Sequence, residues 1–292
     1  MELTLTYKQQ VREVLLEARK NFGGTDAQYA KIYNINGAVY SRLNKGEIEK
    51  IISDSQWLQI GRQLNINIRD IDWKIVRTKV YSEIENSIAF CQAYSRSMIL
   101  VDDCGIGKTF CAKNIVKTLK NAFYIDCSQA KTKQQFIRLL AKTIGLDNKG
   151  KYVDVKENLK YYLNLLHLPI IVVDEAGDLE YPAFLELKEL WNATDGYCGW
   201  YMVGADGLRS KIEKGINSRK VGYAEIFSRF SDEFIKLTPN GVDDKKAFRH
   251  ELLTQVASAN HKGSDPVEKL VNQCMKKEAT LRHLDTLIKI SA

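Results

Sequence analysis

The sequence predicts an α/β protein whose parallel sheet is preceded by a small all-helical domain and followed by a helical C-terminal segment. Short apolar runs of strand length alternate with helical patterns in the middle of the chain, at 98–101, 122–126, 170–173 and 199–204. Such alternation implies a parallel sheet with right-handed crossovers. The two ends of the chain carry helical periodicity alone. We therefore expect three parts, at residues 1–70, 71–239 and 240–292.

The N-terminal part is expected to form a bundle of helices at 7–22, 27–33, 37–43 and 55–64. Apolar residues recur at helical spacing in the first of them, and Gly23-Gly24 ends it. Thr25-Asp26 has the composition of an N-cap for the second helix. The second and third helices are separated by the three residues Asn34-Ile35-Asn36. Two short helices joined by so short a turn indicate a helix-turn-helix layout.

The stretch from Ser97 to Lys117 indicates a nucleotide-binding loop. An apolar run ends in Asp102-Asp103, and Gly105, Gly107, Lys108 and Thr109 follow before a helical pattern begins. Glycines allow backbone N–H groups to converge on an anion, and the helix N-terminus adds its positive dipole. Lys108 would reach the β- and γ-phosphates of ATP, and the Thr109 hydroxyl would hold Mg²⁺. The expected nucleotide-binding residues are Cys104, Gly105, Ile106, Gly107, Lys108, Thr109 and Phe110.

One position departs from the phosphate-loop pattern G-x-x-x-x-G-K-[ST]. The pattern has glycine where this chain has Asp102. A carboxylate facing a triphosphate would be repelled. We therefore expect the Asp102 side chain to point away from the nucleotide, and its effect on turnover stays open.

The segment 169–176 supplies the second half of the expected site. Four apolar residues end in Asp174-Glu175, 66 residues after Lys108. A buried strand would deliver Asp174 to the Mg²⁺ shell, while Glu175 would polarise the attacking water. In parallel sheets ligands bind at the carboxyl ends of strands, where both motifs should arrive.

Further elements follow from periodicity. Helices are expected at 81–94, 110–119, 131–144 and 153–166, a strand at 233–237, and C-terminal helices at 243–260, 266–276 and 280–290. The connector at 67–79 is expected to be short.

Composition narrows the class of protein. The net charge of +7 permits a polyanionic partner without requiring one. Six scattered cysteines form no C-x-x-C pair, so neither a zinc site nor a disulfide framework is indicated. The N-terminus lacks a leader pattern and no stretch reaches membrane-span length. We expect a soluble cytoplasmic protein that is not associated with membranes.

Together these motifs resemble the AAA+ ATPases over about 210 residues. That resemblance implies a polar "sensor 1" residue after the strand 199–204, for which Asp206 is the candidate. Ser228-Arg229-Phe230 resembles the arginine-finger position, with Arg209 and Arg219 as reserves, and Arg282 resembles the "sensor 2" arginine of the helical lid. Turn chemistry at Asp206-Gly207 and ordinary surface arginines are the structural alternatives.

The N-terminal run T-D-A-Q-Y-A-K-I-Y-N-I-N-G-A-V-Y-S-R-L-N-K-G-E resembles the Cro/repressor helix-turn-helix. Fused to a short AAA+ module, it is similar to the transposition regulators MuB, IstB and TnsC. The resemblance implies ATP and Mg²⁺ as cofactors, and double-stranded DNA, a transposase and further copies of the chain, in a ring or helical filament, as partners. The implied DNA-contacting residues are Gln28, Asn36, Tyr40, Ser41, Arg42 and Lys45 in the N-terminal domain, with Lys131 and Lys133 in the ATPase domain.

Two other functions remain open from the sequence. An ATP-switched transcription regulator would read a short operator through its helix-turn-helix, and a helicase-loader-like ATPase would act on a partner ring. The helical bundle could also serve protein contacts, and the lysines at 131 and 133 could be a solvated helix start.

Overall fold

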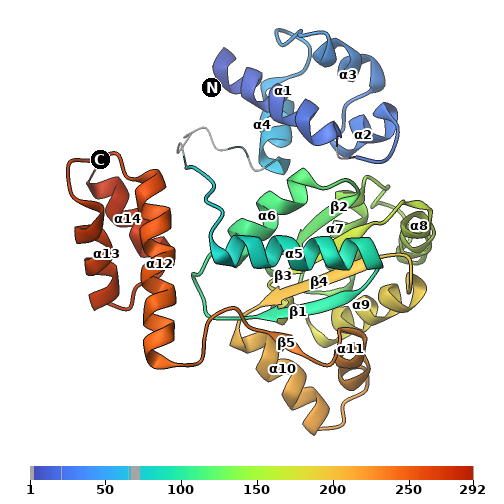
Figure 1. Ribbon diagram of the computed structural model, residues 1–292. Coiled ribbons are helices and arrows are strands. Elements are labelled where there is room, and N and C mark those ends of the chain that lie inside the picture. The colour runs from blue at the N-terminus through green and yellow to red at the C-terminus, as the bar shows by residue number, and fades with distance from the viewer. Residues whose placement is uncertain (1–2, 21, 65, 67–72, 292) are drawn as a thin grey trace.

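The structure is a computed structural model, and it describes residues 3–20, 22–64, 66 and 73–291. The predicted connector at 67–79 falls partly outside these residues. The sheet contains β1 (Ser97–Val101), β2 (Ala122–Asp126), β3 (Ile170–Asp174), β4 (Gly199–Gly204) and β5 (Phe234–Ile235). The strands are all parallel and lie in the order β2-β3-β4-β1-β5. This arrangement confirms the predicted α/β class (Figure 1).

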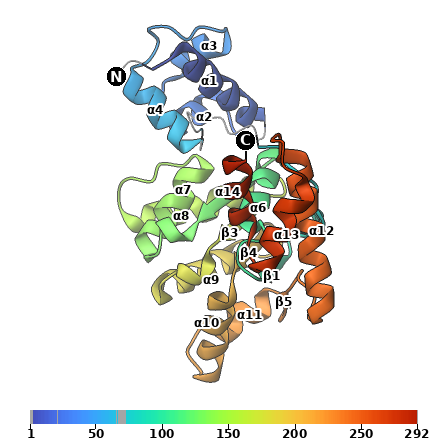
Figure 2. The ribbon, with the colours of Figure 1, turned by 90° about the vertical axis from the view of Figure 1, so that its left-hand side faces the viewer.

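Alternate residues of the central strands face opposite sides of the sheet. Ile99 and Val101 pack into one core, whereas Leu100 packs into the other. Apolar side chains fill both cores, as expected when helices cover both faces of a parallel sheet. On one face lie α7 (Lys133–Ile144), α8 (Tyr152–Leu165), α9 (Tyr181–Ala193), α10 (Asp206–Asn217) and α11 (Tyr223–Arg229). On the other lie α5 (Lys79–Tyr94), α6 (Lys108–Thr118) and the C-terminal helices (Figure 2).

The C-terminal helices form a lid beside the sheet. They are α12 (Val242–Asn260), α13 (Val267–Lys276) and α14 (Leu281–Ile290). Buried residues of all three, such as Leu252, Leu270 and Leu284, share a core with α5 and α6. The lid is therefore packed on the side of the sheet that α5 and α6 cover (Figure 1).

The N-terminal domain has its own core. It consists of α1 (Leu5–Lys20), α2 (Asp26–Ile32), α3 (Gly37–Asn44) and α4 (Asp54–Gln63), packed around Leu15, Tyr29 and Trp57. Thr25 is the N-cap of α2, as predicted, and Asn36 caps α3 by accepting a hydrogen bond from the Val39 N–H. These caps fix the residue at which each helix begins. Asn36 thereby ends the short connection between α2 and α3.

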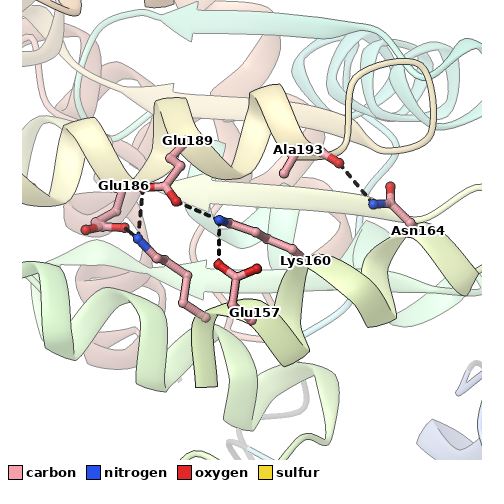
Figure 3. A network of polar contacts seen from close by, with 7 residues as sticks. Glu157, Lys160, Asn164, Glu186, Glu189 and Ala193 are labelled. Carbon is pink, nitrogen blue, oxygen red and sulfur yellow. Dashed lines mark hydrogen bonds and ion pairs between the residues drawn. The ribbon is translucent and has the colours of Figure 1, made fainter. Parts of the chain in front are cut away.

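A charged network fastens α8 to α9 on the face away from the lid. Lys156 donates to Glu186 and Glu189, and Lys160 donates to Glu189 and Glu157 (Figure 3). Asn164 adds a hydrogen bond to the carbonyl of Ala193 at the end of α9. The network holds the crossover helix α8 in place at the edge of the sheet.

The elements differ from the sequence prediction in two respects. The predicted strand at 233–237 pairs with β1 over two residues only, Phe234 and Ile235. The helices α9, α10 and α11 were not predicted.

Candidate functional site

A cleft of about 840 Å³ opens at the carboxyl end of the sheet. The loop after β1, the ends of β3 and β4, and the lid all contribute to its walls. Its polar lining includes Lys108, Thr109, Asp174, Glu175 and Arg282. The sequence predicted each of these residues for one site, and the structure brings them together.

The loop after β1 has the backbone of a phosphate cradle. Gly105 and Gly107 adopt positive φ angles of 76° and 99°, which glycine reaches without a steric penalty. Helix α6 then starts at Lys108, and no side chain caps its N-terminus. Its first N–H groups are thus available to an anion, together with the positive end of the helix dipole.

Lys108 is held inside this loop. Its side chain is 9% exposed, and its Nζ donates to the carbonyls of Asp102 and Asp103, each at 2.7 Å. Burial lowers the pKa of Lys108, and the nearby acids oppose that shift. The ammonium therefore lies at the loop before any phosphate arrives, with backbone carbonyls as provisional partners.

The Asp102 side chain points away from the loop interior, as the sequence predicted. Its Oδ2 accepts hydrogen bonds from the N–H groups of Leu237 and Thr238, at 2.6 and 2.8 Å. Its Oδ1 accepts from the Asp103 N–H at 2.7 Å, so main-chain donors engage both oxygens of the carboxylate.

The end of β3 presents the two acidic residues differently. Asp174 is 1% exposed, and its Oδ1 accepts from the Glu175 N–H at 3.0 Å. Glu175 has a left-handed backbone with φ 49°, a strained conformation that is common at functional sites, and its side chain is exposed to the cleft. Burial, then the neighbouring Asp174 and Asp178, raise the pKa of Glu175. A raised pKa suits a carboxylate that takes a proton from water.

Tyr124 on β2 was not among the residues predicted for the site. Its hydroxyl donates to Asp174 Oδ2 at 2.6 Å, and Lys113 of α6 lies over its ring, with Nζ 5.2 Å from the centroid. Burial, then the charge of Asp174, raise the pKa of Tyr124, so the hydroxyl keeps the proton that it donates. The feature that could have indicated Tyr124 is a phenol hydroxyl on β2, the strand that pairs with β3. The register that places it was not readable from the sequence.

The residues present suit a magnesium ion. Thr109 and Asp174 line the same cleft and offer the hard oxygen ligands that Mg²⁺ prefers. Among the described residues, no group of three His, Cys, Asp or Glu side chains could hold a metal ion.

The three remaining predicted catalytic residues occupy different places. Arg282, in the first turn of α14, lines the cleft. Arg229 of α11 is not among the described residues that line it. Its Nε instead donates to Asn192 Oδ1 at 2.7 Å, and its guanidinium lies over the Trp191 ring.

The structure does not bring Asp206, the predicted sensor 1 residue after β4, to the cleft. Here Gly204 and Ala205 line the cleft, whereas Asp206 does not. Ala205 is the extended N-cap residue of α10, and Asp206 is exposed in the first turn of that helix. An acid there interacts favourably with the helix dipole, which explains its presence without a role at the nucleotide.

The predicted DNA-contacting residues are not all at the surface. Tyr40 is 3% exposed and packs edge-on against Tyr29, with ring centroids 5.8 Å apart, so the prediction that it faces DNA is wrong. It lies three residues before Leu43, on the buried side of α3. The other predicted residues are exposed: Gln28, Asn36, Ser41, Arg42, Lys45, Lys131 and Lys133.

Several of these exposed side chains already have partners. Gln28 completes the capping box of α2 with Thr25, and Arg42 pairs with Glu47 at 2.7 Å. Lys131 pairs with Asp178 at 2.9 Å, and Lys133 lies over the Tyr152 ring. Exposed pairs of this kind contribute little to stability, so these side chains can exchange partners at small cost.

Comparison with known proteins identifies the central part of the chain. Residues 92–212 match the family model described as AAA domain. The matched segment contains β1 to β4 and the helices between them. None of the curated proteins matches the sequence. The match and the all-parallel sheet together support a P-loop ATPase of the AAA type, a class that binds nucleotide with a divalent metal. No helix among the described residues has the length and apolar character to cross a membrane.

Proposed function

We propose that the chain is an ATP-dependent, DNA-binding AAA+ ATPase that assembles on target DNA and delivers that DNA to a transposase. One observation carries the ATPase part of the proposal. A single cleft gathers Lys108, Thr109, Asp174, Glu175 and Arg282 from three separate segments of the chain. DNA binding and delivery rest on the resemblance to the transposition regulators.

Each cleft residue has a chemical task in this proposal. Lys108 and the N–H groups at the start of α6 bind the β- and γ-phosphates. Thr109 and Asp174 would hold Mg²⁺, which when bound neutralises the charge of the phosphates. Glu175 orients the attacking water and accepts its proton. Arg282 reaches the phosphates from the lid.

The position of Arg229 supports a role at the nucleotide cleft of a neighbouring subunit. It lies on α11, at the end of the molecule far from the lid's α13 and α14 (Figure 1). An arginine that completes the cleft of another copy stabilises transition-state charge only after assembly. Hydrolysis in the proposal is therefore slow for the isolated chain and faster in the oligomer.

The N-terminal domain supplies the proposed contact with DNA. Helix α3 lies on the side of that domain away from the sheet (Figure 1). Its exposed residues Ser41 and Arg42, with Lys45 at its end, form a polar and basic surface of the kind that contacts the DNA backbone and base edges. Lys131 and Lys133 offer a second basic point, at the start of α7.

The ATPase part can be tested with two substitutions. Lys108→Ala should abolish ATP binding in equilibrium titration, because the buried ammonium has no replacement. Glu175→Gln should still bind ATP but hydrolyse it roughly 10²- to 10⁴-fold more slowly, the usual worth of a general base. Full ATP affinity in the first variant, or normal turnover in the second, would contradict these roles.

The DNA part is tested by electron microscopy and binding assays on random duplex DNA, with and without ATP. The proposed function requires coating of duplex DNA with ATP, little sequence preference, and affinity that falls steeply with salt. A footprint on one short site would instead indicate a transcription regulator. Weak duplex binding together with a requirement for a partner ring would indicate a helicase-loader-like ATPase.

A further inference from the structure

Asp102, the residue that departs from the phosphate-loop pattern, joins that loop to the start of the lid. Its side chain is 2% exposed, yet it carries a carboxylate. Oδ2 accepts from the N–H groups of Leu237 and Thr238, which lie between β5 and α12. Pro239 and Gly241 follow in the same short segment, so the chain changes direction there before the lid begins.

The main chain of Asp102 contacts the catalytic side of the loop. Its carbonyl accepts from Lys108 Nζ at 2.7 Å, and its N–H donates to the carbonyl of Gly204 at the tip of β4, at 3.4 Å. One residue is thus bonded to the phosphate-binding lysine, to the neighbouring strand tip and, through its side chain, to the segment that carries the lid.

Two further contacts connect the loop with the lid itself. Asp103 pairs with Lys245 of α12 at 2.5 Å, and the Leu281 N–H at the start of α14 donates to the Gly105 carbonyl at 3.1 Å. The Asp103 pair is partly exposed, at 31% and 38% for the two side chains, so water and salt screen it. The Asp102 bonds are buried and charge-assisted, and such bonds are the stronger kind.

We propose that Asp102 is a positioning residue that ties the lid segment at 237–238 to the phosphate loop and so slows the release of bound nucleotide. A nucleotide in the cleft lies between Lys108 on the loop and Arg282 on the lid. The lid must move relative to the loop for the nucleotide to leave, and the Asp102 tether opposes that motion. This inference rests on the proposed nucleotide site.

Glycine at position 102, as the pattern has it, would remove the two bonds from the lid segment and also the bond that Oδ1 accepts from the Asp103 N–H at 2.7 Å. The Thr238 N–H belongs to a residue that is 4% exposed, so it would lose its partner without gaining water. Asparagine keeps the shape and one acceptor oxygen but loses the charge. The tether should therefore be weakest in Asp102→Gly and intermediate in Asp102→Asn.

The experiment uses the full chain with Asp102→Gly, Asp102→Asn and, as the matched control, Asp103→Asn. Two rates are measured: hydrogen exchange of the Leu237 and Thr238 amides without nucleotide, and dissociation of a fluorescent ATP analogue chased with unlabelled ATP. Asp102→Gly should raise both rates at least about tenfold, and Asp102→Asn should fall between it and the wild type. Asp103→Asn should change both less than about threefold, because its pair is screened.

An Asp102→Gly protein that folds but releases the analogue at the wild-type rate would overturn the inference. A lower melting temperature with an unchanged release rate would overturn it as well. If Asp102→Gly does not fold, Asp102→Asn decides in the same way, with an unchanged release rate as the refuting result. Failure of the wild-type chain to bind the analogue would overturn the proposed function, and this inference with it. Tight binding with unchanged release in the variants would overturn the inference alone.

Discussion

The pairing of Tyr124 with Asp174 explains how a strand-end carboxylate can be aimed before its metal ion is present. Asp174 is almost completely buried, and both of its oxygens accept hydrogen bonds, one from Tyr124 and one from the Glu175 N–H. A buried acid with fixed partners loses little freedom when a ligand arrives. Residues that orient a metal ligand commonly matter nearly as much as the ligand itself.

Tyr124→Phe should weaken the use of Mg²⁺ while leaving the fold intact. Removal of the hydroxyl frees Asp174 Oδ2, so we expect the Mg²⁺ concentration needed for half-maximal ATP hydrolysis to rise about 10- to 100-fold. The measurement is ATPase rate against Mg²⁺ concentration. The exposed Tyr161→Phe on α8 serves as the control. An unchanged Mg²⁺ dependence in Tyr124→Phe would show that the hydroxyl does not orient the metal ligand.

At the residue scale, the chemical roles of the site residues could be predicted from the sequence better than the side chains that pack around them. Lys108, Thr109, Asp174 and Glu175 could be predicted because each follows a short motif at the end of a strand. Tyr124 could not, because the pairing of β2 with β3, with Asp126 opposite Asp174, is a tertiary fact. The error at Tyr40 has the same origin: a polar-tipped ring on a short helix fits either face until the packing of Tyr29 is known.

At the scale of elements, local turn chemistry concealed one helix. Asp206 was predicted as a sensor 1 residue with turn chemistry as the structural alternative, yet it starts α10. Aspartate is favoured both in the first turn of a helix and in a tight turn, because in each place its carboxylate lies near free N–H groups. The sequence therefore does not distinguish the two. Strands β1, β3 and β4 were predictable because their apolar runs are buried on both faces of the sheet.

The charged network between α8 and α9 has a pH dependence that can be predicted (Figure 3). Burial alone would raise the pKa of Glu189, but hydrogen bonds from Lys156 and Lys160 outweigh it and hold the pKa below its ordinary value of 4.5. A carboxylate whose pKa is lowered by folding stabilises the protein above its unfolded pKa. That contribution is lost as the pH falls through the lower folded pKa.

Glu189→Gln should therefore cost less than about 1 kcal/mol at pH 7, because the Glu189 side chain is 44% exposed and water screens it. The difference from the wild type should shrink as the pH is lowered from about 5 to 3. Urea unfolding at several pH values measures it, with Glu213→Gln on the exposed side of α10 as the control. A difference that stays constant across this range would contradict the assignment.

At the scale of the whole molecule, the N-terminal domain forms part of the nucleotide cleft. Gln10 and Val14 of α1 line the cleft that Lys108 also lines. The two domains also touch at Gly145, where an added Cβ would lie 2.8 Å from Ile32 Cδ1. A nucleotide that fills the cleft is therefore next to the domain that carries α3.

This arrangement predicts linkage between ATP and DNA if α3 binds DNA. Whatever factor ATP imposes on the affinity for duplex DNA, DNA must impose on the affinity for ATP, and typical coupling lies at about 5- to 150-fold. Glu175→Gln, which should hold ATP without turnover, allows both affinities to be measured at equilibrium. Substituting Val14→Glu, which puts a charge into the shared wall, should change the coupling factor. Equal DNA affinity with and without ATP would exclude the linkage.

The placement of Arg229 makes the last prediction one about assembly. In the isolated chain its guanidinium is held by Asn192, the Glu225 carbonyl and the Trp191 ring, away from the cleft that Lys108 lines. Arg229→Ala should therefore bind ATP normally and lose about 10³-fold or more in turnover if the residue acts on a neighbouring subunit. Mixing Arg229→Ala with Lys108→Ala tests this directly, because each variant lacks what the other can supply. Some mixed contacts pair an intact cleft with an intact arginine, so activity should reappear on mixing. A mixture as inactive as its components would place the finger elsewhere, with Arg209 and Arg219 next to be substituted.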